Sequence, residues 1–83
     1  MKTELGKELY KHLKQFMLEE NWYSNENIPR QARALFVSIC IVEEIEADTA
    51  AAENMLLELY AITGLDDLME YEDFENFMYE YMV

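Results

Sequence analysis

The 83-residue sequence contains one cysteine, one histidine and two glycines, and each scarcity excludes a kind of site. Cys40 has no second cysteine with which to form an internal disulfide, and Cys40 and His12 together cannot supply the ligands of a zinc site. Gly6 and Gly64 are too few for a glycine-rich phosphate-binding loop, and no EF-hand pattern is present. We therefore expect a reduced, cytoplasmic protein that has no metal site and needs no cofactor.

Long apolar runs are also missing. The longest such run, residues 35–42, is interrupted by Ser38 and is far shorter than the ~20 residues that a membrane-spanning helix needs. Residues 2–14 alternate charged and apolar side chains, which is not the pattern of a secretion signal. A net charge of −12 disfavours anionic lipid surfaces and direct contact with DNA or RNA. We expect neither a membrane nor a nucleic acid to be a direct partner.

Basic residues are absent from residues 34–83, which contain thirteen carboxylates. Residues 1–33 carry a formal charge of +1 and the remainder a formal charge of −13. Such a charge destabilises the compact state through self-repulsion, and it exceeds the magnitude of roughly 2–8 that keeps a small domain in solution. A positively charged partner would explain this excess.

The composition predicts a folded chain rather than an acidic tail. Apolar residues make up 52% of the sequence and eleven residues are aromatic, whereas disordered acidic segments are poor in both. A chain of this length forms one domain, residues 1–83, which buries about 60–65% of the surface of its unfolded state.

Helical periodicity predicts a first helix over residues 3–19, with Thr3 as its N-cap. Residues 21–28 are rich in Asn and Ser and predict a loop, from which Trp22 and Tyr23 fold back onto the core. The side chains of the first helix that are expected to face inward are Leu5, Leu9, Leu13, Phe16 and Met17.

A second helix is predicted over residues 29–47, because proline suits the first turn of a helix. Its segment 36–42 is apolar and rich in β-branched residues, so a buried strand is the competing interpretation. The helix is preferred because no second strand is evident to pair with it. Asp48 or Thr49 caps a third helix that ends at Gly64, and its inward residues include Met55, Leu56, Leu59 and Ile62.

The last helical region covers residues 66–82, either as one helix or as a turn followed by a helix from Asp73. Asp67 and Glu70 have the spacing of a capping box at its start. Phe74, Phe77, Met78, Tyr81 and Met82 fit one apolar stripe. The predicted fold is therefore all-α, a compact single-domain bundle of about four helices.

Acidic side chains of the last region form the candidate partner-binding surface. Successive carboxylates three or four positions apart on a helix lie about 5–6 Å from one another, and rows of negative charge on rigid helices imitate a nucleic-acid backbone. Tyrosines add contact area at low entropic cost. The predicted contact residues are Asp66, Asp67, Glu70, Glu72, Asp73, Glu75 and Glu80, with Tyr71 and Tyr79; a second acidic face would come from Glu43, Glu44, Glu46, Asp48, Glu53 and Glu58.

Two other interpretations of the charges stay open. The acidic rows can be solvated helix faces, and Lys7, Lys11 and Lys14 form a basic stripe that is solvated, pairs with neighbouring helices, or contacts a second copy in a homodimer.

The pairs Glu43-x-x-Glu46 and Glu70-x-x-Asp73 resemble the ExxE and ExxD pairs of all-α nucleoside triphosphate pyrophosphohydrolases. That resemblance implies a magnesium-dependent hydrolase, in which clustered carboxylates hold Mg²⁺ against the substrate phosphates. The fuller glutamate set of that family is missing.

The segment Met69-Glu70-Tyr71-Glu72-Asp73-Phe74 is similar to the acidic aromatic stretch near the end of plasmid antirestriction proteins. More generally, a short acidic helical chain resembles the DNA mimics that phages and plasmids use against host defence, and the immunity proteins that neutralise basic toxins. The resemblance implies a non-enzymatic inhibitor that occupies the basic groove of a nucleic-acid-binding protein. The alternatives are a helical dimerisation or interaction module without an inhibitory role, and the magnesium-dependent hydrolase.

Overall fold

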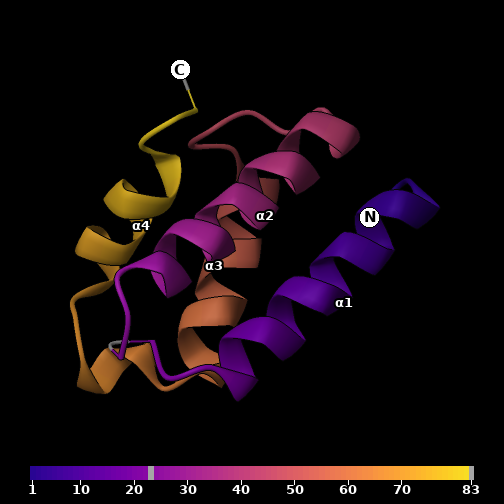
Figure 1. Ribbon diagram of the computed structural model, residues 1–83. Coiled ribbons are helices and arrows are strands. Elements are labelled where there is room, and N and C mark those ends of the chain that lie inside the picture. The colour runs from indigo at the N-terminus through magenta and orange to yellow at the C-terminus, as the bar shows by residue number, and fades with distance from the viewer. Residues whose placement is uncertain (23, 83) are drawn as a thin grey trace.

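The computed structural model describes residues 1–22 and 24–82, so the predicted packing of Tyr23 lies outside the described residues. In this part of the chain four α-helices and one 3₁₀ helix form a single domain without strands, which confirms the all-α prediction (Figure 1). The elements are α1 (Glu4–Glu19), α2 (Asn27–Glu43), α3 (Ala50–Ile62), η1 (Leu65–Asp67) and α4 (Tyr71–Tyr79).

The helix starts at Thr3 and Thr49 are confirmed. The Thr3 hydroxyl accepts a hydrogen bond from the Gly6 N–H (2.8 Å), and the Thr49 hydroxyl accepts one from the Ala52 N–H (3.3 Å). Each hydroxyl satisfies one of the N–H groups that the first helical turn leaves without a partner. Gly64 follows α3 with φ of 69°, a left-handed conformation that glycine adopts without strain, and the chain turns there into η1.

The prediction for the second helix is correct in type and wrong at its end. α2 is a helix and not a strand, and Pro29 lies in its first turn, but it ends at Glu43 instead of Ala47. Glu44 takes a left-handed conformation, φ 57°, and the Ile45 N–H closes the end by donating to the Cys40 carbonyl (2.8 Å). Helix-forming residues at 45–47 therefore lie in the loop that leads to α3.

The final region is two elements, η1 and α4, separated by residues 68–70. The predicted capping box is wrong, because Asp67 is the last residue of η1 and Glu70 caps α4 without a side-chain hydrogen bond. The Leu68 N–H donates instead to the Leu65 carbonyl (2.9 Å), which gives the tighter turn of a 3₁₀ helix.

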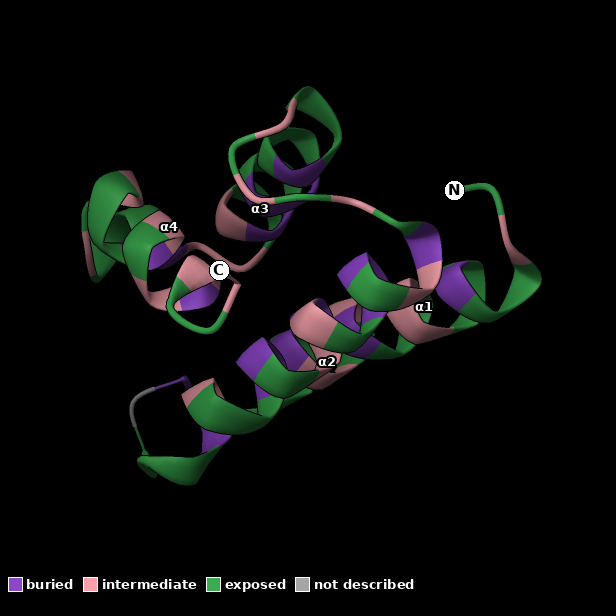
Figure 2. Cartoon of the chain, turned by 90° about the horizontal axis from the view of Figure 1, so that it is seen from above, coloured by how far each residue is buried: buried purple, intermediate pink, exposed green. Residues whose placement is uncertain are grey.

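The helices form two layers. α1 and α2 lie antiparallel, side by side, and α3 with α4 covers the inner side of this pair (Figures 1 and 2). Trp22 folds back as predicted and meets Phe74 edge to face at 5.9 Å. Leu5, Ile62 and Tyr81 were predicted to face inward and are instead 57, 42 and 68% exposed. The core contains Leu13, Met17, Trp22, Ala32, Phe36, Ile39, Cys40, Ala52, Met55, Leu56, Leu59, Leu65, Phe74 and Met78.

Candidate functional site

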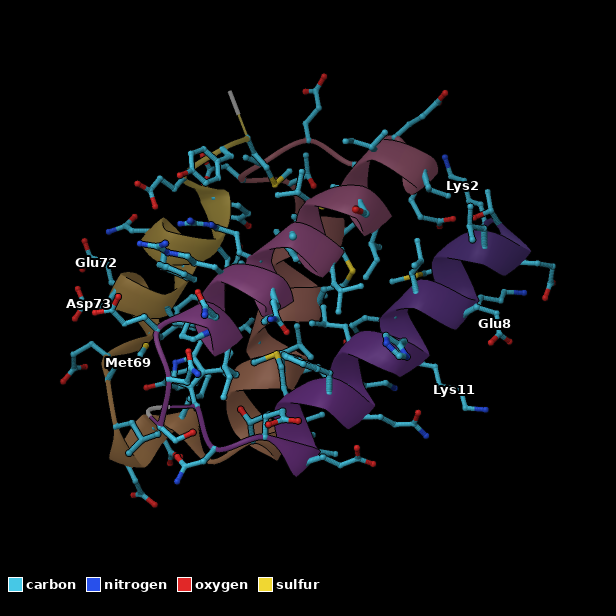
Figure 3. All side chains as sticks on the ribbon, viewed as in Figure 1. Lys2, Glu8, Lys11, Met69, Glu72 and Asp73 are labelled. Atoms are coloured by element: carbon cyan, nitrogen blue, oxygen red, sulfur yellow. The ribbon has the colours of Figure 1, made fainter. Side chains whose placement is uncertain are left out.

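Five of the predicted contact carboxylates lie on one short stretch, from η1 to the first turn of α4. We call Asp66, Asp67, Glu70, Glu72 and Asp73 the acidic edge. All five are exposed, and none forms an ion pair with another described residue. In Figure 3 the side chains of Glu72 and Asp73 point outward from α4 into solvent. Their negative charge also suits the N-terminal end of a helix, which carries a partial positive charge.

Glu80 has a different environment, because it pairs with Arg33 of α2. The Arg33 side chain is only 7% exposed and lies between two rings, 4.2 Å from the centroid of Phe77 and 4.3 Å from that of Tyr81. The guanidinium group also donates to the Phe77 carbonyl (3.3 Å). Glu80 therefore helps to fix the end of α4 against α2 and is not a free carboxylate.

Tyr71 and Tyr79 pack against the core. The Tyr71 ring meets Tyr60 edge to face at 5.4 Å, and the Tyr79 ring lies 6.1 Å from that of Phe36. Both hydroxyl oxygens are buried. Burial raises the pKa of Tyr71, and the neighbouring half-buried Glu75 carboxylate raises the pKa further. These rings attach α4 to the domain and leave only their outer edges for a partner.

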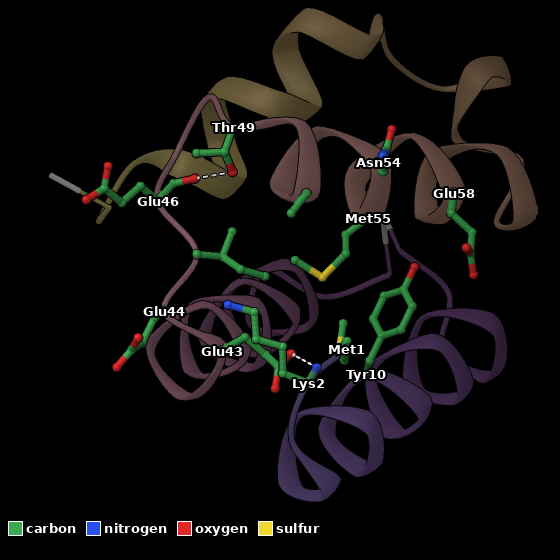
Figure 4. A pocket seen from close by; sticks show the side chains of 12 residues that line it. Met1, Lys2, Tyr10, Glu43, Glu44, Glu46, Thr49, Asn54, Met55 and Glu58 are labelled. Atoms are coloured by element: carbon green, nitrogen blue, oxygen red, sulfur yellow. Dashed lines mark hydrogen bonds between the residues drawn. The ribbon is translucent and has the colours of Figure 1, made fainter.

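Of the predicted second acidic face, Glu44, Glu46, Asp48 and Glu53 are exposed, whereas Glu43 is buried at 4% exposure. Its carboxylate accepts hydrogen bonds from the backbone N–H of Lys2 (2.6 Å), the backbone N–H of Thr3 (2.8 Å) and the Thr3 hydroxyl. Figure 4 shows the bond to Lys2. The hydroxyl bond is the main reason that the pKa of Glu43 is lowered, and the backbone bonds act in the same direction.

The two acidic pairs of the hydrolase interpretation are not brought together. Glu43 is held at Lys2, and Figure 3 places Lys2 and Asp73 on opposite sides of the molecule. Among residues 1–22 and 24–82, no group of three or more His, Cys, Asp or Glu side chains has the geometry to hold a metal ion.

A cavity of about 860 Å³ lies beside Glu43, between the start of α1, the end of α2 and α3 (Figure 4). Its walls include Tyr10, Met55 and Glu58. Burial, followed by the charge of Glu58, raises the pKa of Tyr10. Lys14 lies 4.8 Å from the centroid of the Tyr10 ring and pairs with Glu58 at 3.3 Å, so the charge of Glu58 is neutralised within the chain.

The basic stripe of α1 is partly paired. Lys14 reaches Glu58 of α3, as the pairing interpretation expected, while Lys7 pairs with Glu4 of its own helix at 3.3 Å. Lys11 is exposed on the side of the molecule opposite to Glu72 and Asp73 (Figure 3). Lys11, the lysine of the stripe without an ion pair among the described residues, therefore lies far from Glu72 and Asp73.

The burial of Glu43 and Arg33 was not predicted from the sequence. A signal was present, because both fall on the buried stripe of α2 at helical spacing from apolar neighbours. That stripe comprises Ile28, Ala32, Arg33, Phe36, Ile39, Cys40 and Glu43. Cys40 lies in the core, and its burial raises the pKa of its thiol to about 11.

Comparison of the chain with protein-family models, curated proteins and solved structures finds no match. No helix in the described part of the chain has both the length and the apolar character needed to cross a membrane.

Proposed function

We propose that this protein is a non-enzymatic acidic binding module, whose acidic edge docks in the basic groove of a nucleic-acid-binding protein. Occupation of that groove would inhibit the partner by excluding its nucleic acid. The supporting observation is the acidic edge itself: five exposed carboxylates within eight residues, without a cationic partner among the described residues.

The acidic edge is sparser in charge than duplex DNA, because helical carboxylates three or four positions apart lie about 5–6 Å from one another, so it matches a part of such a groove. Duplex DNA carries one negative charge for each ~1.7 Å of its axis, and a basic groove is arranged to neutralise phosphates at that density. Residues 66–73 fold into η1, a short connection and the first turn of α4, so their carboxylates are presented by a compact, helical segment. Complementary fields would speed encounter with the partner and select against anionic surfaces.

No ion pair within residues 1–22 and 24–82 neutralises this edge. Residues 34–83 contain no Lys or Arg, and the nearest arginine in the sequence, Arg33, is committed to Glu80. Ordinary solvated helix faces place opposite charges at i+4, where they add about 0.2–0.5 kcal/mol to a helix. Residues 34–83 have no such stabilising pairs of opposite charge, and this absence favours a binding role for the carboxylates.

The test compares two triple variants of equal charge. Asp66→Asn/Glu70→Gln/Asp73→Asn neutralises the acidic edge, and Glu8→Gln/Glu19→Gln/Glu20→Gln neutralises three exposed acids at α1 and its end. Binding to purified basic nucleic-acid-binding proteins is measured by calorimetry at about 50 and 300 mM NaCl.

We expect binding that weakens with salt and is reduced at least tenfold, about 1.4 kcal/mol, by the edge variant alone. Displacement of labelled DNA from the partner would measure inhibition directly. Absence of a salt-sensitive complex, or equal weakening by both variants, would refute the proposal.

A further inference from the structure

A second exposed surface lies on α2, on the side turned away from α3 (Figure 2). Ala34, Ser38 and Ile41 follow one another at i, i+4 and i+7, so they share one stripe of this helix. Ile41 is 72% exposed, the highest value among the exposed large hydrophobic residues of the described chain. Tyr81, at 68%, flanks the stripe, where it lines a hollow of about 540 Å³ together with Val37 and Ile41.

Opposite charges stand at the two ends of this stripe. Arg30 is exposed in the first turns of α2, and Glu44 is exposed directly after its last residue. They are fourteen residues apart, so about the full length of α2 separates the two charges. Neither takes part in an ion pair with another described residue. Between them the stripe carries no charge, although the chain as a whole carries −12.

This arrangement complements itself. If two α2 helices pair antiparallel about a two-fold axis near Val37 and Ser38, Arg30 of one copy lies opposite Glu44 of the other. The same register places Ile41 opposite position 33 of the second copy, one residue from Ala34. Beside Ala34 is a hollow of about 650 Å³, whose walls include the Arg33–Glu80 ion pair as well as Val37, Phe77 and Tyr81, and the apolar part of this hollow can receive the protruding Ile41 side chain.

We propose that this α2 face is the interface of a two-fold homodimer. Homodimers of this symmetry use one self-complementary patch on both subunits, and a protruding side chain, a matching hollow and opposite terminal charges on one helix meet that requirement.

The size of the patch sets the strength of association. α2 has 17 residues and is therefore about 25 Å long, so one helix face and the adjoining Tyr81 bury less than the ~800 Å² per partner of a standard interface. We expect a reversible dimer whose formation depends on concentration. Two copies of charge −12 repel each other, so added salt should strengthen the dimer. Partner binding at the acidic edge should respond to salt in the opposite direction, which keeps the two proposals separable.

Sedimentation equilibrium of the full chain, from about 5 µM to 1 mM protein and at about 50 and 500 mM NaCl, tests the dimer. We expect the mass to rise from 9.9 kDa toward twice that value, and to rise at lower protein concentration in the higher salt. Ile41→Glu should weaken association at least tenfold. Leu18→Glu is the matched control, because Leu18 is an exposed side chain of α1 at 57% and gains the same charge.

A monomeric mass over the whole range, or equal association of the two variants, would overturn the proposal. So would a monomer that instead binds an unrelated protein through Ile41. Circular dichroism of each variant checks that the helices are intact.

Charge exchange tests the antiparallel register. Arg30→Glu and Glu44→Arg should each weaken self-association, because each places like charges opposite one another twice in the dimer. An equimolar mixture should recover association, because the heterodimer restores two opposite-charge contacts. A mixture that associates no better than either variant alone would contradict the pairing of Arg30 with Glu44.

Discussion

At the scale of the residue, Glu43 shows how one carboxylate in an acidic chain can have a structural task. The first N–H groups of a helix have no partner within the helix, and Glu43 accepts from two backbone N–H groups at the start of α1 and from the Thr3 hydroxyl. The negative charge also lies at the positive end of the α1 dipole. A carboxylate from the end of α2 thereby completes the cap that Thr3 begins.

The substitution Glu43→Gln should destabilise the domain at neutral pH. The amide has one acceptor oxygen where the carboxylate has two, and it turns N–H donors toward the backbone N–H groups of Lys2 and Thr3. We expect the thermal midpoint to fall by about 5–10 °C at pH 7. Glu46→Gln, at a nearby exposed residue outside the proposed dimer contact, is the control and should leave the midpoint nearly unchanged.

The pH dependence of this difference follows from the lowered pKa of Glu43. Because the folded state binds the proton less tightly than the unfolded state, the contribution of Glu43 is complete above the ordinary value of 4.5 and is lost as the pH falls through the folded-state pKa. Thermal unfolding of the native chain and Glu43→Gln from pH 7 to pH 3 should show their midpoints converging below pH 4.5. A constant difference over this range would contradict the assignment.

At the scale of the element, local signals predicted helix type and the starting points of α1 and α3, whereas α2 begins at Asn27 instead of Pro29 and α4 begins at Tyr71 instead of Asp66 or Asp73. Thr3 and Thr49 acted as caps and Gly64 as a turn, because hydroxyl acceptors and a left-handed glycine work within a few residues of the chain. The end of α2 could not be predicted in this way. Residues 45–47 are compatible with a helix, and the chain leaves α2 because Glu43 is held at the start of α1 and Ile45 packs against the core.

In the candidate site, too, some features could be predicted from nearby residues and others depend on contacts between distant parts of the chain. The exposure of the acidic edge was predictable, because charged residues without partners remain in water. The burial of Arg33 depends on Phe77 and Tyr81, which lie more than forty positions away and meet it only after α4 has packed. The apolar periodicity of α2 places Arg33 on the buried side of the helix, but the sequence of one helix does not show which residues of another helix will contact it.

The contact between α1 and α2 predicts that one substitution, Gly6→Ala, destabilises the domain when the Glu43 carboxylate is present and stabilises it when that carboxylate is removed. A Cβ atom at Gly6 would overlap the Glu43 carboxylate, and the three nearest heavy atoms to it all belong to Glu43. Gly→Ala inside a helix ordinarily stabilises by about 0.5–1 kcal/mol. We expect Gly6→Ala to destabilise the native chain, because it displaces the anchored carboxylate, and to stabilise the Glu43→Ala variant.

Urea unfolding of the native chain, both single variants and the double variant measures this coupling. The substitution Gly6→Ala should change the free energy of unfolding in opposite directions in the two backgrounds. The same change in both backgrounds would show that a side chain at position 6 and the Glu43 carboxylate do not compete for the space.

At the scale of the whole molecule, the distribution of charge separates two tasks. Glu72 and Asp73 of the acidic edge lie on the side of the molecule opposite to Lys2 and Lys11 (Figure 3), and the stripe of α2 consists of exposed, uncharged residues. A molecule of charge −12 with one neutral helix face can approach a copy of itself there, while its acidic edge remains open to a basic partner. The proposed dimer would thus present two acidic edges, which increases the effective concentration at a partner that has two grooves.

This charge should have a measurable cost to folding. The carboxylates of residues 34–83 repel one another when little salt is present to screen them, whereas only three ion pairs join described residues and two of these lie at the surface. Repulsion should therefore outweigh attraction at low ionic strength.

We expect the thermal midpoint at pH 7 to rise by several degrees between about 10 and 200 mM NaCl, a range in which screening dominates. The measurement is made at a protein concentration where sedimentation shows monomer, and with Ile41→Glu in parallel, so that dimer formation does not supply the increase. A midpoint that stays constant or falls with salt would mean that the carboxylates are already compensated in the folded chain, and it would remove the reason to seek a cationic partner.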